Sequence, residues 1–190
     1  MPATSAVSIC SNALLLLGDA PISSFDENND RTRLVANLYT MKRDRVLRAH
    51  SWNCATKREI LSPDTTAPKF DWAYKFLLPD DWLRTLSVGL DGDEDEYQIE
   101  GRYILMDSNV CRLRYIFRNE VEATWDSLLI EAMTQVMVAA LTYPITKSTT
   151  KQATEEEIVK RVLKESRAIN GQEETPATLG DFPLLANRIR

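Results

Sequence analysis

The chain has 190 residues, of which 44% are hydrophobic and 27% charged, and its formal net charge is −5. This composition supports a sizeable core, so it excludes a disordered chain and favours one domain, or one domain with a large insertion. The start, MPATSAVSIC, has no basic side chain ahead of a short apolar run. We therefore expect neither a signal peptide nor a membrane span, and a chain made in the cytoplasm.

Two helices and a sharp corner are predicted in the N-terminal part. The first helix begins at a Thr4 or Ser5 cap and ends at Leu17, because apolar residues repeat on one face of this segment. The second covers about Arg31 to Ala49 and has an apolar sector with helical spacing. Both are built without a nucleophile motif, a metal cluster or a phosphate loop.

From Thr56 onward the hydrophobic periodicity changes to two, which indicates a small antiparallel sheet. A tight hairpin is expected at Glu100 and Gly101. The predicted strands are Tyr74–Leu78, Trp82–Val88, Tyr97–Ile99, Tyr103–Met106 and Cys111–Arg118.

Helices return after Asp126, which caps a segment that is apolar almost all round and continues to about Leu141. Such a helix is typical of one surrounded by other elements. Pro144 is expected to end it. A last helix follows from about Thr150 to Ile169, with Asn170-Gly171 as its stop signal.

The predicted fold class is α+β: a helical bundle of about four helices with a small antiparallel β insertion between the second and third helices, plus an extended C-terminal arm. Residues 1–55 and 119–171 are assigned to the bundle, 56–118 to the insertion and 172–190 to the arm. The arm combines apolar and basic side chains, so it either docks on a partner as a peptide or packs back on its own bundle. Its candidate docking residues are Leu179, Phe182, Leu184, Leu185, Arg188, Ile189 and Arg190.

Charge is distributed unevenly along the chain. Eight basic residues stand against one acid from Arg31 to Arg58, and nine acids against two basic residues from Asp80 to Asp107. These segments are either two solvated surfaces or two poles through which copies of the chain meet. The candidate interface charges are Lys42, Arg43, Arg45 and Arg48 on one side, and Asp93, Glu94, Asp95 and Glu96 on the other. Lys42 and Arg45 fall inside the apolar sector of their helix, so each must snorkel or find a carboxylate.

Catalytic, cofactor and metal sites are not predicted. Asp91, Asp93 and Asp95 have the spacing of a calcium loop, but its sixth position is Glu96 and its twelfth is Arg102, where glycine and glutamate are required. His50 is the only histidine and has no recognisable nucleophile beside it. The three cysteines lack metal-ligand spacing, so we expect buried free thiols.

Four segments in this order resemble the tail tubular protein A family of short-tailed bacteriophages. They are LLLLGDAPISSFDE (14–27), RDRVLRAHSWNCATKR (43–58), FDWAYKFLLPDDWLR (70–84) and RLRYIFR (112–118). The resemblance spans nearly the whole chain, although none of these segments is a catalytic signature. The chain departs from the family at Ser51, where proline is frequent, and at Cys54, where an aromatic residue is common.

The resemblance implies a structural virion protein of the tail or neck, made in the host cytoplasm, without enzymatic activity or cofactor. Members are head-to-tail adaptors, so it further implies a homo-oligomeric ring of twelve copies. The implied partners are the portal protein, the tail nozzle protein and genomic DNA passing non-specifically through the channel, with no membrane. The alternative from the residues alone is a small regulatory or nucleic-acid-binding module that uses the basic segment 31–58.

Overall fold

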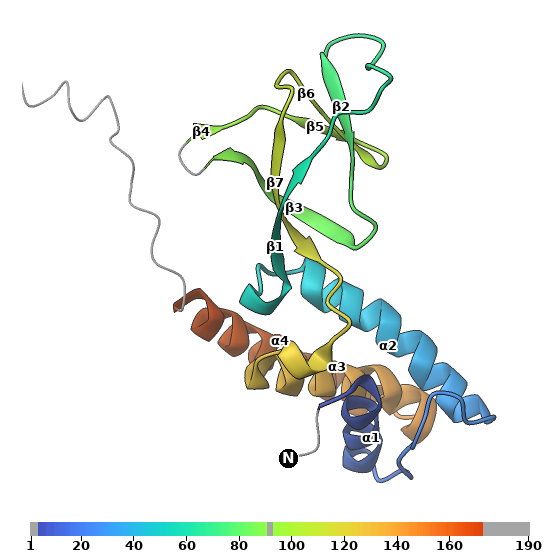
Figure 1. Ribbon diagram of the computed structural model, residues 1–190. Helices are drawn as coiled ribbons and strands as arrows, with labels where there is room; N and C mark the ends of the chain where they lie inside the picture. The colour runs from blue at the N-terminus through green and yellow to red at the C-terminus, as the bar shows by residue number, and fades with distance from the viewer. Residues whose placement is uncertain (1–3, 91–92, 173–190) are drawn as a thin grey trace, which may run out of the picture.

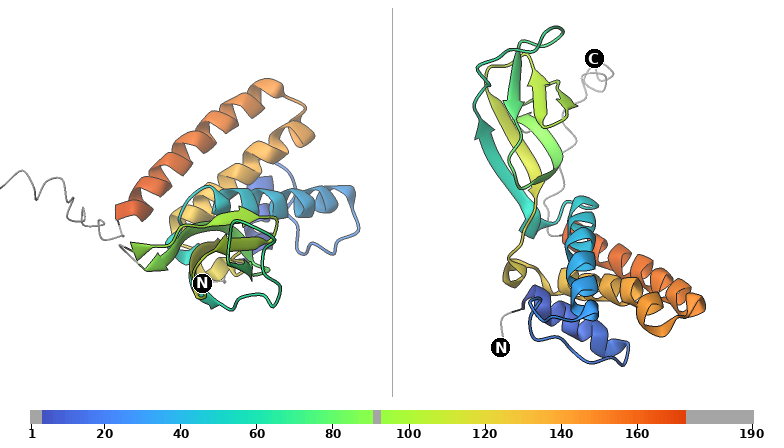
Figure 2. Two further views of the ribbon diagram at one scale, coloured as in Figure 1. Left: turned by 90° about the horizontal axis from the view of Figure 1, so that it is seen from above. Right: turned by 90° about the vertical axis from the view of Figure 1, so that its right-hand side faces the viewer.

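The computed structural model describes residues 4–90 and 93–172, and it places helices at one end of the molecule and strands at the other (Figure 1). The helices are α1 (Ala6–Leu16), α2 (Asp30–Arg48), α3 (Ser127–Thr146) and α4 (Thr149–Gln172). Two short 3-10 turns, Asn53–Ala55 and Glu122–Thr124, lie where the chain leaves and rejoins the helical body. Figure 2 shows the resulting elongated shape from two further sides.

The strands form two antiparallel sheets between α2 and α3. One sheet has the order β1-β7-β3-β4 and the other β2-β6-β5. The strand bounds are β1 Thr56–Leu61, β2 Tyr74–Leu77, β3 Trp82–Leu90, β4 Asp93–Glu94, β5 Gln98–Glu100, β6 Tyr103–Met106 and β7 Cys111–Phe117. The β5–β6 hairpin turns at Gly101, whose φ of +59° favours glycine.

Each end of the molecule has its own apolar core. The β core is shared by both sheets, with Phe76 and Ile104 from one and Leu113 and Tyr115 from the other, all buried. The helical core is larger and extends into the base of β3 and β7, because Leu83 and Ile116 belong to it. The two ends are therefore joined by packing as well as by the chain.

The predicted fold class is wrong. A small antiparallel insertion in a helical bundle does not describe seven strands in two sheets that enclose a core of their own. Two strands could not be predicted from hydrophobic periodicity. β1 has four consecutive exposed residues and so lacks the expected alternation, and β4 has only two residues. The predicted C-terminal arm covers residues 172–190. Gln172 is the last residue of α4, and residues 173–190 lie outside the described residues.

Several helix ends follow from local chemistry. The Ser5 side chain accepts a hydrogen bond from the Ser8 backbone N–H in a capping box, as the predicted cap implies. The Asp126 side chain caps α3 by accepting a hydrogen bond from the backbone N–H of Leu129. The helix continues beyond Pro144 to Thr146, and its C-cap residue Lys147 has the left-handed conformation, so the predicted stop at the proline is wrong. A proline this near a helix end removes one backbone hydrogen bond and leaves the preceding turns intact.

Helix α3 forms the centre of the helical body and is packed against α1, α2 and α4. It is long and apolar enough to cross a membrane by composition, and half of its most apolar window is buried inside the protein. Met133, Val136 and Met137 are among its buried side chains. Its all-round apolar character is thus accounted for by the three helices around it.

Candidate functional site

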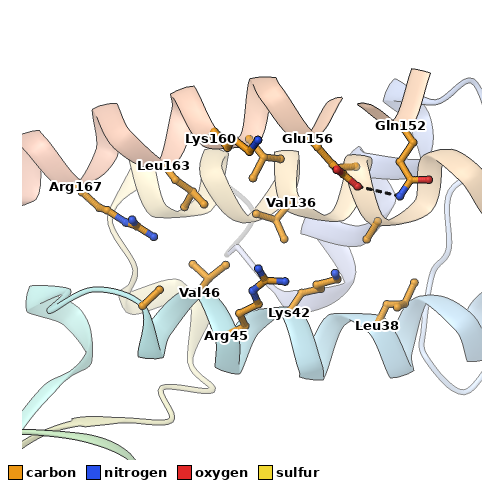
Figure 3. Close-up of a pocket in the computed structure, with 14 residues that line it drawn as sticks. Leu38, Lys42, Arg45, Val46, Val136, Gln152, Glu156, Lys160, Leu163 and Arg167 are labelled. Carbon is orange, nitrogen blue, oxygen red and sulfur yellow. Dashed lines mark hydrogen bonds between the residues drawn. The ribbon is translucent and has the colours of Figure 1, made fainter. Parts of the chain in front are cut away.

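A groove lies between α2 and α4 on the helical body (Figure 3). Helix α3 packs against both walls and forms the floor. The groove has a volume of about 500 Å³. Ala49, Ala139 and Ala140 line part of it, and their small side chains leave space that larger residues would fill.

The groove combines an apolar floor with a basic rim. The apolar side chains are Leu38, Val46, Val136, Val159 and Leu163. The cations are Lys42 and Arg45 from α2, and Lys160 and Arg167 from α4. The one acid, Glu156, accepts a hydrogen bond from Gln152 Nε2 over 2.9 Å. The groove thus offers apolar contact area and positive charge together.

Three of these cations have no carboxylate partner within the described part of the chain. The only ion pair made by a groove cation joins Lys160 to Glu157 over 2.6 Å. Figure 3 shows Lys42 and Arg45 extending from α2 toward α4, and Arg167 extending from α4 toward α2. The Arg167 Nε is buried without a hydrogen-bond partner, which is an unfavourable state for a donor. Within the described residues, Lys42, Arg45 and Arg167 therefore carry positive charge that no ion pair neutralises.

The two walls are tied together at one end by Asn170. Its side chain donates to the Ser51 carbonyl oxygen over 3.2 Å and accepts from the Asn53 backbone N–H over the same distance. It also lies 3.2 Å from Nε2 of His50, whose ring packs edge-on against Trp52. These contacts hold α4 in helical conformation through residues 170–172, so the predicted stop at Asn170-Gly171 is wrong. His50 serves this junction.

The structure divides the predicted basic interface residues into two pairs. Lys42 and Arg45 lie in the groove. Arg43 is buried and pairs with Asp44 and Glu120, both at 3.0 Å. Arg48 donates to the Leu83 carbonyl oxygen and stands over the Trp82 ring. Arg43 and Arg48 therefore make contacts within the molecule and are not free to bind another protein.

The predicted acidic residues lie at the opposite end of the molecule. Asp93 and Glu94 form β4 and are exposed, and Asp95 and Glu96 follow directly. None of the four makes an ion pair within the described residues. Leu90, the register partner of Asp93, is 56% exposed. The hairpin end thus presents acids beside an exposed apolar side chain.

Lys160 and Arg167 are not among the interface residues predicted from the sequence. A signal was present, because the two are seven residues apart and so share a helix face with Val159 and Leu163. The sequence does not predict that α2 lies opposite that face of α4.

In the described residues, no group of three or more potential metal ligands occurs. Cys10 and Cys111 are buried and Cys54 is half-buried, all free. Burial raises the pKa of Cys10 to about 12, that of Cys111 to about 12 and that of Cys54 to about 11. These thiols are therefore protonated and unreactive at neutral pH.

The seven predicted arm residues, Leu179, Phe182, Leu184, Leu185, Arg188, Ile189 and Arg190, lie outside the described residues. Comparison with known proteins adds nothing to the site: no protein-family model matches the chain, and no curated protein is found to be similar to it.

Proposed function

We propose that the protein is a structural virion component, a head-to-tail adaptor of a short-tailed bacteriophage. In this role, twelve copies form a ring between the portal protein and the tail nozzle protein, and genomic DNA passes through the middle. The protein is made in the host cytoplasm and resides in the tail or neck of the virion. It carries out no chemical reaction.

The observation that supports this proposal is the separation of two charged surfaces whose side chains, apart from Lys160, make no ion pair within the described residues. The groove cations lie on the helical body and the acids of residues 93–96 on the β body. A protein whose complementary surfaces are different patches associates head to tail, and such contacts close into rings when the rotation allows. The resemblance of the four sequence segments to the adaptor family supports the portal protein and the tail nozzle protein as the partners of this ring.

The alternative, nucleic-acid binding through residues 31–58, is weakened by how that segment uses its cations. Arg31 pairs with Asp19 over 2.8 Å, and Lys57 pairs with Asp81 over 2.9 Å. Arg43 and Arg48 are engaged internally. A phosphate-binding surface requires cations free to release counterions, and few remain on this helix.

The deciding experiment combines the purified chain with the portal protein encoded by the same genome. Mass photometry and negative-stain images should show rings of about twelve copies attached to the portal, in agreement with a closed heterologous assembly. A portal from a long-tailed phage serves as the control and should not be bound. Failure to bind the cognate portal at tens of micromolar, together with salt-sensitive binding of short DNA duplexes, would favour the alternative.

A further inference from the structure

We infer that the groove between α2 and α4 is a binding site for an acidic amphipathic helix of another protein. The bound helix lies along the groove, with its apolar face on α3 and its carboxylates against the cations of the rim. This inference goes beyond the proposed function and does not depend on it, because it is argued from the groove alone and holds whether or not the chain forms a ring.

The groove has the dimensions of a helix. Helix α3 is packed against both α2 and α4, whereas α2 and α4 are not packed against each other along their length. The residues of α4 that line the groove extend from Gln152 to Arg167, which corresponds to about 22 Å at about 1.5 Å per residue. Figure 3 shows the two walls on opposite sides of this space. A helix of about 15 residues therefore fits between them, over α3.

The apolar surface of the groove continues past its edge. Leu38 lines the groove, and Leu34 and Met41 lie four residues before it and three after it, on the same face of α2. Both of these side chains are exposed. On α3, the exposed Tyr143 follows the groove residue Ala140 by three positions. A helix that covers the groove therefore finds further apolar side chains along its path.

The charge of the groove decides the kind of helix that binds. Four cations and one acid line it, which gives a net charge of +3. Within the described residues, Lys42, Arg45 and Arg167 make no ion pair. The Arg167 Nε is also buried without a hydrogen-bond partner, which a bound carboxylate would supply. Two of the cations stand on α2 and two on α4, so a helix with carboxylates on both sides of its apolar face matches both walls.

The four described helices of this chain do not present such a surface. Helix α1 exposes Leu15 and Leu16 but contains no acidic residue. The exposed apolar residues of α2 stand among bases, which the cations of the groove repel. Helices α3 and α4 each expose one large apolar side chain, Tyr143 and Ile169. The acidic strand β4 has only two residues and is too short to cover the groove. The helix that fits therefore comes from a different protein.

Synthetic peptides test this inference on the full chain. The acidic probe is a fluorescein-labelled peptide of about 15 residues, with leucines at helical i, i+3, i+4, i+7 spacing and glutamate or glutamine elsewhere. The basic probe replaces each glutamate by lysine, and the scrambled probe keeps the acidic composition without an apolar face. Fluorescence anisotropy should show that the acidic probe binds at least about tenfold more tightly than the other two.

Variants of the groove locate the binding. K42E with R45E should weaken binding of the acidic probe by about tenfold or more, because it reverses the charge of the α2 wall. A140L should also weaken it, because the larger side chain fills part of the floor without changing the charge. The control is K151E with R161E, which makes the same charge change at exposed positions of α4 outside the groove and should leave the affinity unchanged. Urea unfolding identifies any variant that has lost its fold, and if K42E with R45E has done so, A140L provides the decision.

Four results would overturn the inference. Equal affinities for the acidic probe and either of the other probes would show that the chain has no site of this chemistry. Acidic-probe binding that tolerates both K42E with R45E and A140L would place the site elsewhere. Displacement of the acidic probe by a synthetic peptide of residues 173–190 at a similar concentration would assign the groove to the C-terminal segment. Self-association of the full chain that excludes the probe in sedimentation would assign the groove to a second copy.

Discussion

Arg118 at the end of β7 donates a hydrogen bond from Nε to Oδ2 of Asp44 on α2 over 2.9 Å. The other oxygen of Asp44 accepts from Nε of Arg43 over 3.0 Å, and Arg43 reaches Glu120 beyond the strand. The Asp44 carboxylate thus connects helix α2 to the end of strand β7. The network orients the β body relative to the helices.

Removal of this carboxylate should destabilise the protein. Asp44→Ala leaves the buried Arg43 with Glu120 as its remaining ion-pair partner, so we expect the free energy of unfolding to fall by about 1–3 kcal/mol in urea denaturation. The control is Asp80→Ala, since Asp80 pairs with Arg102 at full exposure and should cost less than about 1 kcal/mol. Equal losses in the two variants would show that the junction network contributes no more than a surface pair.

Thiol accessibility should follow burial. Cys54 is half-buried, whereas Cys10 and Cys111 are fully buried. With Ellman's reagent at pH 8, Cys54 should react first, and all three should react far more slowly than in the urea-unfolded chain, because the thiolate is the reactive form. Immediate labelling of all three thiols in the native protein would contradict the structure.

The raised thiol pKa values also predict a loss of stability in alkali. Burial holds the pKa of Cys10 and Cys111 at about 12, while the unfolded chain has thiols near 9. The unfolded state therefore releases protons first, so stability is complete below about pH 9 and is lost as pH rises toward 12. The buried hydroxyl of Tyr39, whose pKa is raised by burial and by its bond to Glu122, acts in the same direction.

The measurement is the free energy of unfolding in urea at pH 7 and pH 10.5. Each buried thiol should account for a loss on the order of 1–2 kcal/mol at the higher pH. A Cys10→Ala variant, compared with the parent at both values, should lose less between them. An unfolding free energy that is the same at pH 7 and pH 10.5 would refute the raised pKa values of Cys10 and Cys111.

Gly89 is required in β3, where it is the register partner of Glu94 in β4. Its φ is +108°, and a Cβ there would lie 2.6 Å from the Asp93 carbonyl oxygen and 2.8 Å from the Asp95 nitrogen. Gly89→Ala should destabilise the β body by about 1–3 kcal/mol. Gly171→Ala is the matched control, because its Cβ meets no atom within 4 Å and alanine favours the helix. Urea unfolding compares the two, and a neutral Gly89→Ala would show that the β3–β4 pair adjusts freely.

The C-terminal arm carries a prediction that rests on its sequence. Phe182→Ala combined with Leu185→Ala should weaken binding to the cognate portal by orders of magnitude, since each well-buried side chain contributes roughly 1.5–3 kcal/mol. Helical content measured by circular dichroism should not change. Truncation after Gln172 should have the same effect, and unchanged portal affinity would show that the arm is not the docking element.

The sequence predicted local features well where one residue decides the outcome. The Ser5 and Asp126 caps and the turn at Gly101 lie where their chemistry places them. Cys111, Leu113 and Tyr115, at alternate positions of the predicted strand, are buried in β7. These signals act over four residues or fewer and do not depend on distant neighbours.

Features that depend on tertiary partners could not be predicted. Lys42, Arg43, Arg45 and Arg48 share one basic helix, and only the packing of β3 and β7 against α2 separates the internal pair from the groove pair. The stop at Asn170 failed for the same reason, because its side chain binds a segment more than a hundred positions away. Periodicity identifies the face of a helix and not what lies opposite.

The pairing of β1 with β7 has a consequence for how the protein folds. Thr56 and Ile116 are register partners, so the chain leaves and rejoins the helical body at one place. Bringing α1 and α2 onto α3 and α4 would otherwise require closing a loop of about 60 residues, at an entropic cost of about 3–4 kcal/mol. A β body that forms first removes most of this cost. We therefore expect the sheets to protect their amides from hydrogen exchange before the helical core does during refolding.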